Sequence, residues 1–196
     1  MSAADEQRFV AVVTADPTVR AVLDRAPALG LADWWLTAGV RFQTVWNDLT
    51  GRPPGTGIRD ADFFYFDADT SWQAEDAVIR AGAKLFGDLP VPVEIRNEAR
   101  VHLWYEQKFG VPAAPFRDCA DAIDHFAAVC CCYGIRVGAS GAIEVYAPHG
   151  YADLFALVVR PNPRLAPRHV YEAKTARWRQ QWPELTVLPW DDGGAR

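Results

Sequence analysis

The segment RDADFFYF, residues 59–66, decides the fold expected for this chain of 196 residues. It is an aromatic-rich run typical of a β-strand, and we expect a strand over residues 58–66 that ends at Asp67. In a strand, residues two apart share a face and lie about 6.6–6.8 Å apart. Asp60 and Asp62 therefore form an acid pair on one face, where repulsion and lost hydration are costly unless a positive charge lies between them.

The acid pair calls for a positive partner, and a divalent cation would supply it. Carboxylate oxygens without neighbouring Cys or His ligands favour magnesium or manganese over zinc, and magnesium completes its shell with water and phosphate oxygens. The pair therefore indicates a phosphate-bearing substrate. A third acid, Glu94, lies in the next expected strand, residues 89–95, and three carboxylates could hold two ions. The alternative is that the acid pair is a solvated strand start and that Glu94 pairs with Arg96 or Arg100.

A glycine turn precedes the acid pair by about twenty residues. The apolar run over residues 34–38 reads as a short strand that ends at Gly39, and the spacing of the apolar residues that follow predicts a helix. Backbone N–H groups at a helix start attract anions. We therefore expect Ala38 and Gly39, with Gln43 on the following helix, to bind a phosphate.

Basic residues offer further phosphate ligands. Arg41 follows the glycine turn closely enough for its fork of donors to reach a phosphate, and an ion pair with Asp48 or Asp60 is the alternative. A second group near the C-terminus is either a solvated helix face or a basic rim for a nucleotide or acceptor. Its members are Arg160, Arg164, Lys174, Arg177 and Arg179. His102 is expected to be structural rather than a catalytic base.

Composition and charge narrow the class of protein. Half of the residues are apolar and 23% are charged, which excludes a disordered or fibrous chain. The formal net charge of -5 argues against broad binding to nucleic acid or to an anionic membrane. No apolar run approaches the roughly 20 residues that cross a bilayer, so we expect a cytoplasmic protein. The four cysteines lack metal-ligand spacing and are expected to be reduced, buried thiols.

The remaining pattern predicts an α+β chain. Two helices broken at Asp16-Pro17 are expected over residues 5–27, and a hairpin with a turn at 138–141 is expected over residues 135–146. Further helices are expected over residues 72–86, from 118 or 121 to 133, and over 151–159 and 168–181. We place a core with N-terminal helices at residues 1–115, and a C-terminal helical and hairpin portion, packed on the same body, at 116–196.

These motifs resemble a known group of proteins. The order of glycine turn, helix, DxD strand and later single carboxylate is that of the nucleotidyltransferase superfold that includes DNA polymerase beta. More specifically, four segments resemble an uncharacterised bacterial nucleotidyltransferase-like family. They are WLTAGVRFQTVWNDLTG (35–51), GIRDADFFYFD (57–67), VEIRNEARVHLW (93–104) and YAPHGYADLFALVVRPNP (146–163).

The resemblance implies a nucleotidyltransferase-type mixed sheet flanked by helices, with a C-terminal hairpin and helices. It implies that Asp60, Asp62 and Glu94 are catalytic and hold Mg²⁺ or Mn²⁺, and that Gly39 forms the phosphate turn. A nucleoside monophosphate would pass from a nucleoside triphosphate to an acceptor hydroxyl of unspecified class. One ion would lower the pKa of that hydroxyl and the other would stabilise pyrophosphate. The turn departs from the superfold in one respect, because Val40 replaces the usual serine or glycine and offers no hydroxyl.

Two other functions stay open. The first is a nucleotide-binding or interaction module that has kept the fold and lost turnover. The second starts from FFYFDADTS, residues 63–71, which resembles the strand and DxDx(T/S) motif of haloacid-dehalogenase-type phosphatases. Asp67 would be the nucleophile of such an enzyme, although the later paired acids of that family are not evident here.

Overall fold

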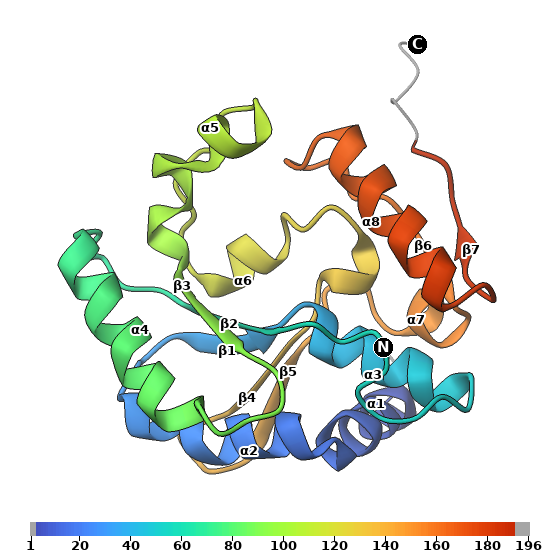
Figure 1. Ribbon diagram of the computed structural model, residues 1–196, viewed down its shortest axis with the longest axis horizontal. Helices are drawn as coiled ribbons and strands as arrows, with labels where there is room; N and C mark the ends of the chain where they lie inside the picture. The colour runs from blue at the N-terminus through green and yellow to red at the C-terminus, as the bar shows by residue number, and fades with distance from the viewer. Residues whose placement is uncertain (1–2, 191–196) are drawn as a thin grey trace.

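A five-stranded mixed sheet forms the centre of the protein in a computed structural model that describes residues 3–190 (Figure 1). The strand order is β3-β2-β1-β4-β5. Strands β2 and β3 are parallel, and the other neighbours are antiparallel. The strands are β1 (Trp34–Thr37), β2 (Ala61–Tyr65), β3 (Val93–Asn97), β4 (Gly134–Val137) and β5 (Ile143–Tyr146). The predicted α+β class with a mixed sheet and a C-terminal hairpin is confirmed.

Helices cover the sheet from two sides. In Figure 1, α1, α2 and α4 lie below the sheet, and α5, α6 and α8 lie above it. Within residues 3–190, no helix combines the length and apolar character needed to cross a membrane. The helices are α1 (Ala3–Ala15), α2 (Pro17–Arg25), α3 (Gly39–Leu49), α4 (Trp72–Phe86), α5 (Tyr105–Phe109), α6 (Cys119–Ile123), α7 (Ala152–Phe155) and α8 (Arg168–Gln181). Short 3₁₀ segments are η1 (Ala26–Leu29), η2 (Glu98–Leu103) and η3 (Val129–Cys131), and a small sheet joins β6 (Val158–Val159) to β7 (Thr186–Val187).

Several boundaries follow from local capping. The break between α1 and α2 falls at Asp16, whose carboxylate accepts hydrogen bonds from the N–H groups of Thr18 at 2.9 Å and Val19 at 3.2 Å. Ser71 caps α4 through the N–H of Ala74 at 3.2 Å. Since these caps involve residues two or three apart, the sequence alone predicted where both helices begin.

The predicted helix from residue 118 or 121 to 133 is wrong beyond its first turns. Helix α6 ends at Ile123. The amide of Asn162 donates to the carbonyls of Asp124 and Phe126, both at 2.8 Å, and the N–H of Val129 donates to the carbonyl of Arg160 at 3.0 Å. These long-range partners take the backbone groups that a helix would use. The helix predicted over 151–159 also shortens, because α7 gives way to β6.

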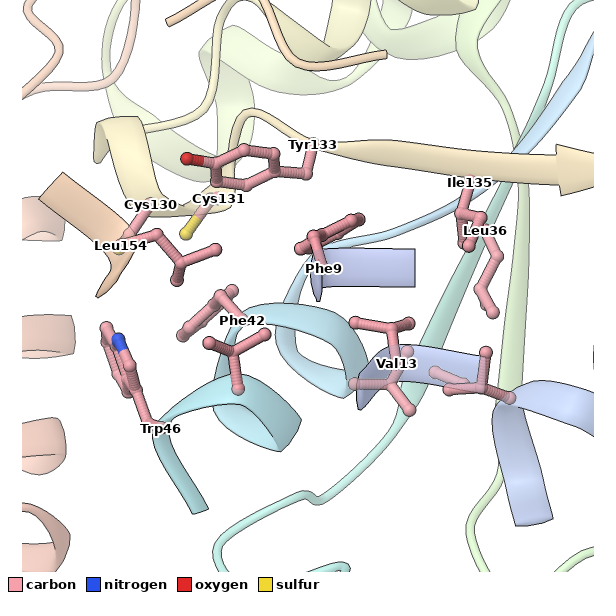
Figure 2. Packing of buried hydrophobic residues seen from close by; sticks show 14 of the residues in the cluster. Phe9, Val13, Leu36, Phe42, Trp46, Cys130, Cys131, Tyr133, Ile135 and Leu154 are labelled. Carbon is pink, nitrogen blue, oxygen red and sulfur yellow. The ribbon is translucent and has the colours of Figure 1, made fainter. Parts of the chain in front are cut away.

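The main core lies between the sheet and the helices α1 and α3. Figure 2 shows Phe9 and Val13 of α1 close to Phe42 of α3 and to the strand residues Leu36 and Ile135. All four cysteines are buried and unpaired, as expected, and Cys130 and Cys131 join this core. The division at residue 115 stays a prediction; strands β4 and β5, which follow it, belong to the central sheet.

Helix α8 is fixed to α3 by tryptophans. The ring of Trp46 lies edge-on to Trp178 at 5.7 Å and to Trp182 at 5.3 Å between centroids. The indole N–H of Trp182 donates to the side-chain oxygen of Asn47 at 3.0 Å. Both residues are buried, so this bond is shielded from water and sets the position of the C-terminal end of α8.

The substitution Trp182→Phe tests this anchor. It keeps most of the ring and leaves the buried Asn47 oxygen without a donor. We expect the free energy of unfolding to fall by about 1–3 kcal/mol, measured by urea denaturation. Trp72→Phe is the control, because Trp72 is 64% exposed. Equal effects of the two substitutions would contradict the anchor.

Candidate active site

The strand register brings the ends of three strands together. Thr37, the last residue of β1, pairs with Asp62 of β2, and Asp62 pairs with Glu94 of β3. Along β2 the residues Ala61, Phe63 and Tyr65 are buried, whereas Asp62 and Phe64 on the other face are half-buried. The alternation therefore sends the carboxylate of Asp62 out of the main core, next to the turn that follows β1.

A cavity of about 300 Å³, here called the turn cavity, joins the predicted residues. Its walls include the turn after β1, the acid pair and the side of α8. Six of the seven predicted site residues line it: Ala38, Gly39, Gln43, Asp60, Asp62 and Glu94. The sequence therefore identified one connected region of the surface, although the segments come from distant parts of the chain.

The acid pair is crowded and lacks protein partners. Within residues 3–190, neither carboxylate forms an ion pair or a hydrogen bond through its side chain. Burial raises the pKa of the Asp62 carboxyl to about 7, and the charges of Asp60 and Glu94 add to the rise while Lys174 opposes it. Burial and the neighbouring carboxylates thus outweigh the nearby cations at Asp62, and a bound cation would favour its charged form.

Glu94 takes a different position from the acid pair. Its side chain is half exposed, and its carboxylate lies 3.5 Å from the guanidinium of Arg96. Arg96 is one of the two partners expected if Glu94 only formed an ion pair. In the described part of the chain, no three His, Cys, Asp or Glu side chains come together closely enough to hold one metal ion. The acid pair alone fits magnesium, which commonly takes one or two carboxylates and completes its shell with water and phosphate oxygens.

The phosphate turn differs in detail from the expectation. The residue with positive φ is Ala38, at φ 56° and ψ -136°, rather than Gly39. This region is costly for a residue that carries a Cβ. Gly39 begins α3, and a Cβ there would lie 3.1 Å from the side-chain oxygen of Gln43. The strained turn and the first N–H groups of an 11-residue helix therefore face the turn cavity together.

Arg41 does not line the turn cavity. Its side chain is 0% exposed, and its guanidinium donates to the hydroxyl of Thr37 at 3.0 Å. Its remaining side-chain nitrogens, Nε and Nη1, have no hydrogen-bond partner among residues 3–190. Burial lowers the pKa of Arg41 to about 9, and the charge of Asp62 opposes that effect. The structure thus places this cation behind the acid pair, and it forms no pair with Asp48 or Asp60.

Helix α8 supplies two of the cations that line the turn cavity. Lys174 and Arg177 line it, opposite the acid pair. Arg160 and Arg164 do not, because they pair with Asp153 at 2.8 Å and Asp124 at 2.9 Å. Of the basic group near the C-terminus, Lys174 and Arg177 therefore line the turn cavity, Arg160 and Arg164 form surface ion pairs, and Arg179 of α8 lies outside the cavity. Arg59 and Lys108 also line the cavity, and no motif had singled them out.

Asp67 and His102 do not line the turn cavity. The carboxylate of Asp67 accepts the N–H of Asp69 at 2.8 Å in an exposed loop, which is a turn-stabilising role. His102 lies in η2, and its Nδ1 is buried without a partner. Neither residue meets the acid pair, so the geometry gives no support to a phosphatase nucleophile at Asp67.

A second cavity, here called the aromatic cavity, continues from the first. Its volume is about 240 Å³. Asp62, Glu94 and Lys174 line both cavities, so Asp62 of the acid pair lies at their junction, whereas Asp60 lines only the turn cavity. Six aromatic side chains line the aromatic cavity, from β2, the start and length of α5, and the loops before and after α6: Phe64, Trp104, Tyr105, Phe109, Phe116 and Phe126. Spread over four segments, these rings have no common spacing that a sequence could reveal.

A mixed sheet with a strained turn at a helix start and an acid pair opposite it defines an α+β nucleotidyltransferase. The chain belongs to the nucleotidyltransferase family, whose profile matches residues 24–187. It is thus an enzyme of nucleoside monophosphate transfer, and the resemblance noted from its motifs is confirmed. A solved structure that "reveals a CCA-adding enzyme head domain" has the same fold, with a TM-score of 0.74 and 24% identity over 94% of this chain and 96% of that chain. No curated protein matches the chain.

Ala38→Gly tests the strain at the phosphate turn. Glycine adopts positive φ readily, so we expect the free energy of unfolding to rise by about 1 kcal/mol. Ala81→Gly, on the exposed face of α4, is the matched control and should lower it by about 0.5–1 kcal/mol. Chemical denaturation measures both. If the two substitutions shift stability in the same direction, the turn is not strained.

Proposed function

We propose that this nucleotidyltransferase uses Mg²⁺ or Mn²⁺ to move a nucleoside monophosphate from a nucleoside triphosphate to an acceptor hydroxyl. One observation carries the proposal: the acid pair, Asp60 and Asp62, lines the same cavity as the phosphate turn Ala38–Gly39. Family membership supports the reaction class. The metal, the triphosphate and the roles of individual residues are our proposal.

The cations and the helix start would bind the phosphates of the substrate. The helix start at Gly39 and the cations Lys174 and Arg177 would bind the triphosphate oxygens. Gln43, beside Gly39, would hold the turn or donate to a phosphate through its amide. Arg41 is a positioning residue in this scheme, since it is buried and bonds to Thr37 directly before the turn.

The transfer itself needs one bond formed and one broken. The acceptor oxygen forms a bond to the α-phosphorus, and the bond from that phosphorus to the α–β bridging oxygen breaks, so pyrophosphate leaves with the electron pair. The hydroxyl proton passes to a carboxylate at the junction of the cavities. Glu94, half exposed and in register with Asp62, is the group placed to accept it.

A divalent ion would be held by Asp60 and Asp62, whose oxygens suit magnesium or manganese. When bound, it supplies charge stabilisation to the phosphates and acidifies the attacking hydroxyl. To accept the hydroxyl proton, Glu94 would turn from Arg96, to which its contact is long (3.5 Å) and half exposed. The energetic cost of that change is small, because exposed ion pairs contribute little.

Asp62→Asn tests the catalytic assignment. The amide keeps the shape and removes the charge, so we expect the fold to persist and pyrophosphate release to fall by at least about a hundredfold. The assay scans each nucleoside triphosphate with magnesium. Asp67→Asn is the control and keeps full activity in our assignment, whereas a phosphatase would lose its nucleophile. Full turnover of Asp62→Asn would remove the assignment, and triphosphate binding by the unaltered protein without any pyrophosphate release would favour the inactive module.

Thermal unfolding tests the metal directly. A ligand that binds only the folded state raises the melting temperature. We therefore expect millimolar Mg²⁺ or Mn²⁺ to stabilise the unaltered protein, because the ion relieves the repulsion within the acid pair, and chelation to reverse the effect. Asp60→Asn combined with Asp62→Asn removes the response. An identical shift in the double variant would place the ion elsewhere.

A further inference from the structure

Glu98 is a buried acid without a protein partner. It is the first residue of η2, four positions after Glu94, and it is 4% exposed. Within residues 3–190 its carboxyl forms no ion pair or side-chain hydrogen bond. Burial raises the pKa of Glu98 well above its usual range, and the charge of Asp62 adds to the effect. Such a group is costly unless a donor reaches it, and it lines the aromatic cavity.

The walls around Glu98 suit an organic cation. Phe64 and Phe126 stack with 5.4 Å between centroids and 24° between planes, and Tyr105 packs on Phe109 at 4.6 Å. Faces of such rings attract ammonium groups, most strongly where water is excluded. One protein ammonium already lies on this wall, since Nζ of Lys108 is 5.3 Å from the ring centroids of both Trp104 and Phe109.

The other charges of the cavity have their own neighbours. Arg96 pairs with Glu94 at 3.5 Å, and Lys108 lies over the rings. The charge of Lys174 acts on Asp62 and lowers its pKa. Lys174 also lines the turn cavity, where the triphosphate is expected. The charge of Arg96 also acts on Glu98, without an ion pair between them. Glu98 is thus the buried acid of this cavity that neither an ion pair nor the proposed metal site uses.

We propose that the aromatic cavity binds the acceptor and that the acceptor is a small alcohol carrying a protonated amine, with the amine on Glu98. The inference rests on the proposed function, because the hydroxyl would lie at Asp62, where the two cavities join. Its oxygen attacks the α-phosphorus, pyrophosphate leaves, and the product is the phosphodiester of the amino alcohol. Glu94 lies in β3 and Glu98 begins η2 four residues later, so the two carboxyls line different parts of the aromatic cavity. The amine and the hydroxyl of the acceptor are therefore expected at opposite ends of a ring-sized body.

Two benzyl alcohols, of which only one carries an ammonium group, test the inference. They are 4-(aminomethyl)benzyl alcohol and the neutral 4-methylbenzyl alcohol, titrated calorimetrically without nucleotide or metal. We expect the amine to bind at least about tenfold more tightly, and Glu98→Gln to remove that advantage without changing the affinity for the neutral alcohol. Glu106→Gln, a substitution of an exposed residue on α5, is the control, and we expect this variant to keep the tighter binding of the amine. Equal affinity for both probes, no binding of the amine, or an unchanged advantage in Glu98→Gln would overturn the proposal.

Folding and nucleotide binding are measured in the same variants. Glu98→Gln removes a buried charge with nearly the same shape, so its melting temperature should not fall. Its affinity for a triphosphate with magnesium should match that of the unaltered protein, because Glu98 does not line the turn cavity. If the amine binds but no triphosphate yields pyrophosphate, the proposed function is refuted, while the binding of an amine at Glu98 is upheld. Pyrophosphate release without amine binding would refute the acceptor class alone.

Discussion

The alternation of β2 is the constraint on which the site depends. Ala61, Phe63 and Tyr65 are buried in the main core, and Phe63 stacks on Trp34 with 5.2 Å between ring centroids. A slip of one residue would bury Asp62 and expose Phe63, so the register is strongly specified. Because β1 and β3 pair with β2 on either side, the same register places Thr37 and Glu94 beside Asp62. The hydrophobic effect thus positions the charges.

Local signals explain what the sequence predicted well. The bounds of α4 and α8, the break at Asp16 and the hairpin of β4 and β5 depend on caps, proline and turn residues close in the chain. The helix predicted to reach residue 133 was wrong because its backbone groups bond to Asn162 and Arg160 instead. Those partners lie some thirty residues away, and no local pattern can reveal them.

The sequence predicted which acids line the turn cavity better than it predicted which cations do. A pair of acids two apart in an aromatic strand is a strong local anomaly, and so is a glycine at a strand-to-helix turn. The strained residue at that turn is nevertheless Ala38, and Arg41 is buried behind it. No sequence pattern singled out Glu98 as a binding residue. Its position in the cavity depends on how η2, α5 and the loop after α6 are arranged around it.

The cavity keeps opposite charges close without pairing them. Lys174 and Arg177 on α8 form no ion pair with Asp60 or Asp62 within residues 3–190, although all four line one cavity. Tryptophans 178 and 182 hold α8 against α3, so the helix cannot move in to neutralise the acids without breaking that packing. Unpaired charges fixed by a packed core are the preorganised arrangement that stabilises charge as it develops in a reaction. The aromatic core between α3 and α8 therefore fixes the positions of the cations that line the turn cavity, besides stabilising the fold.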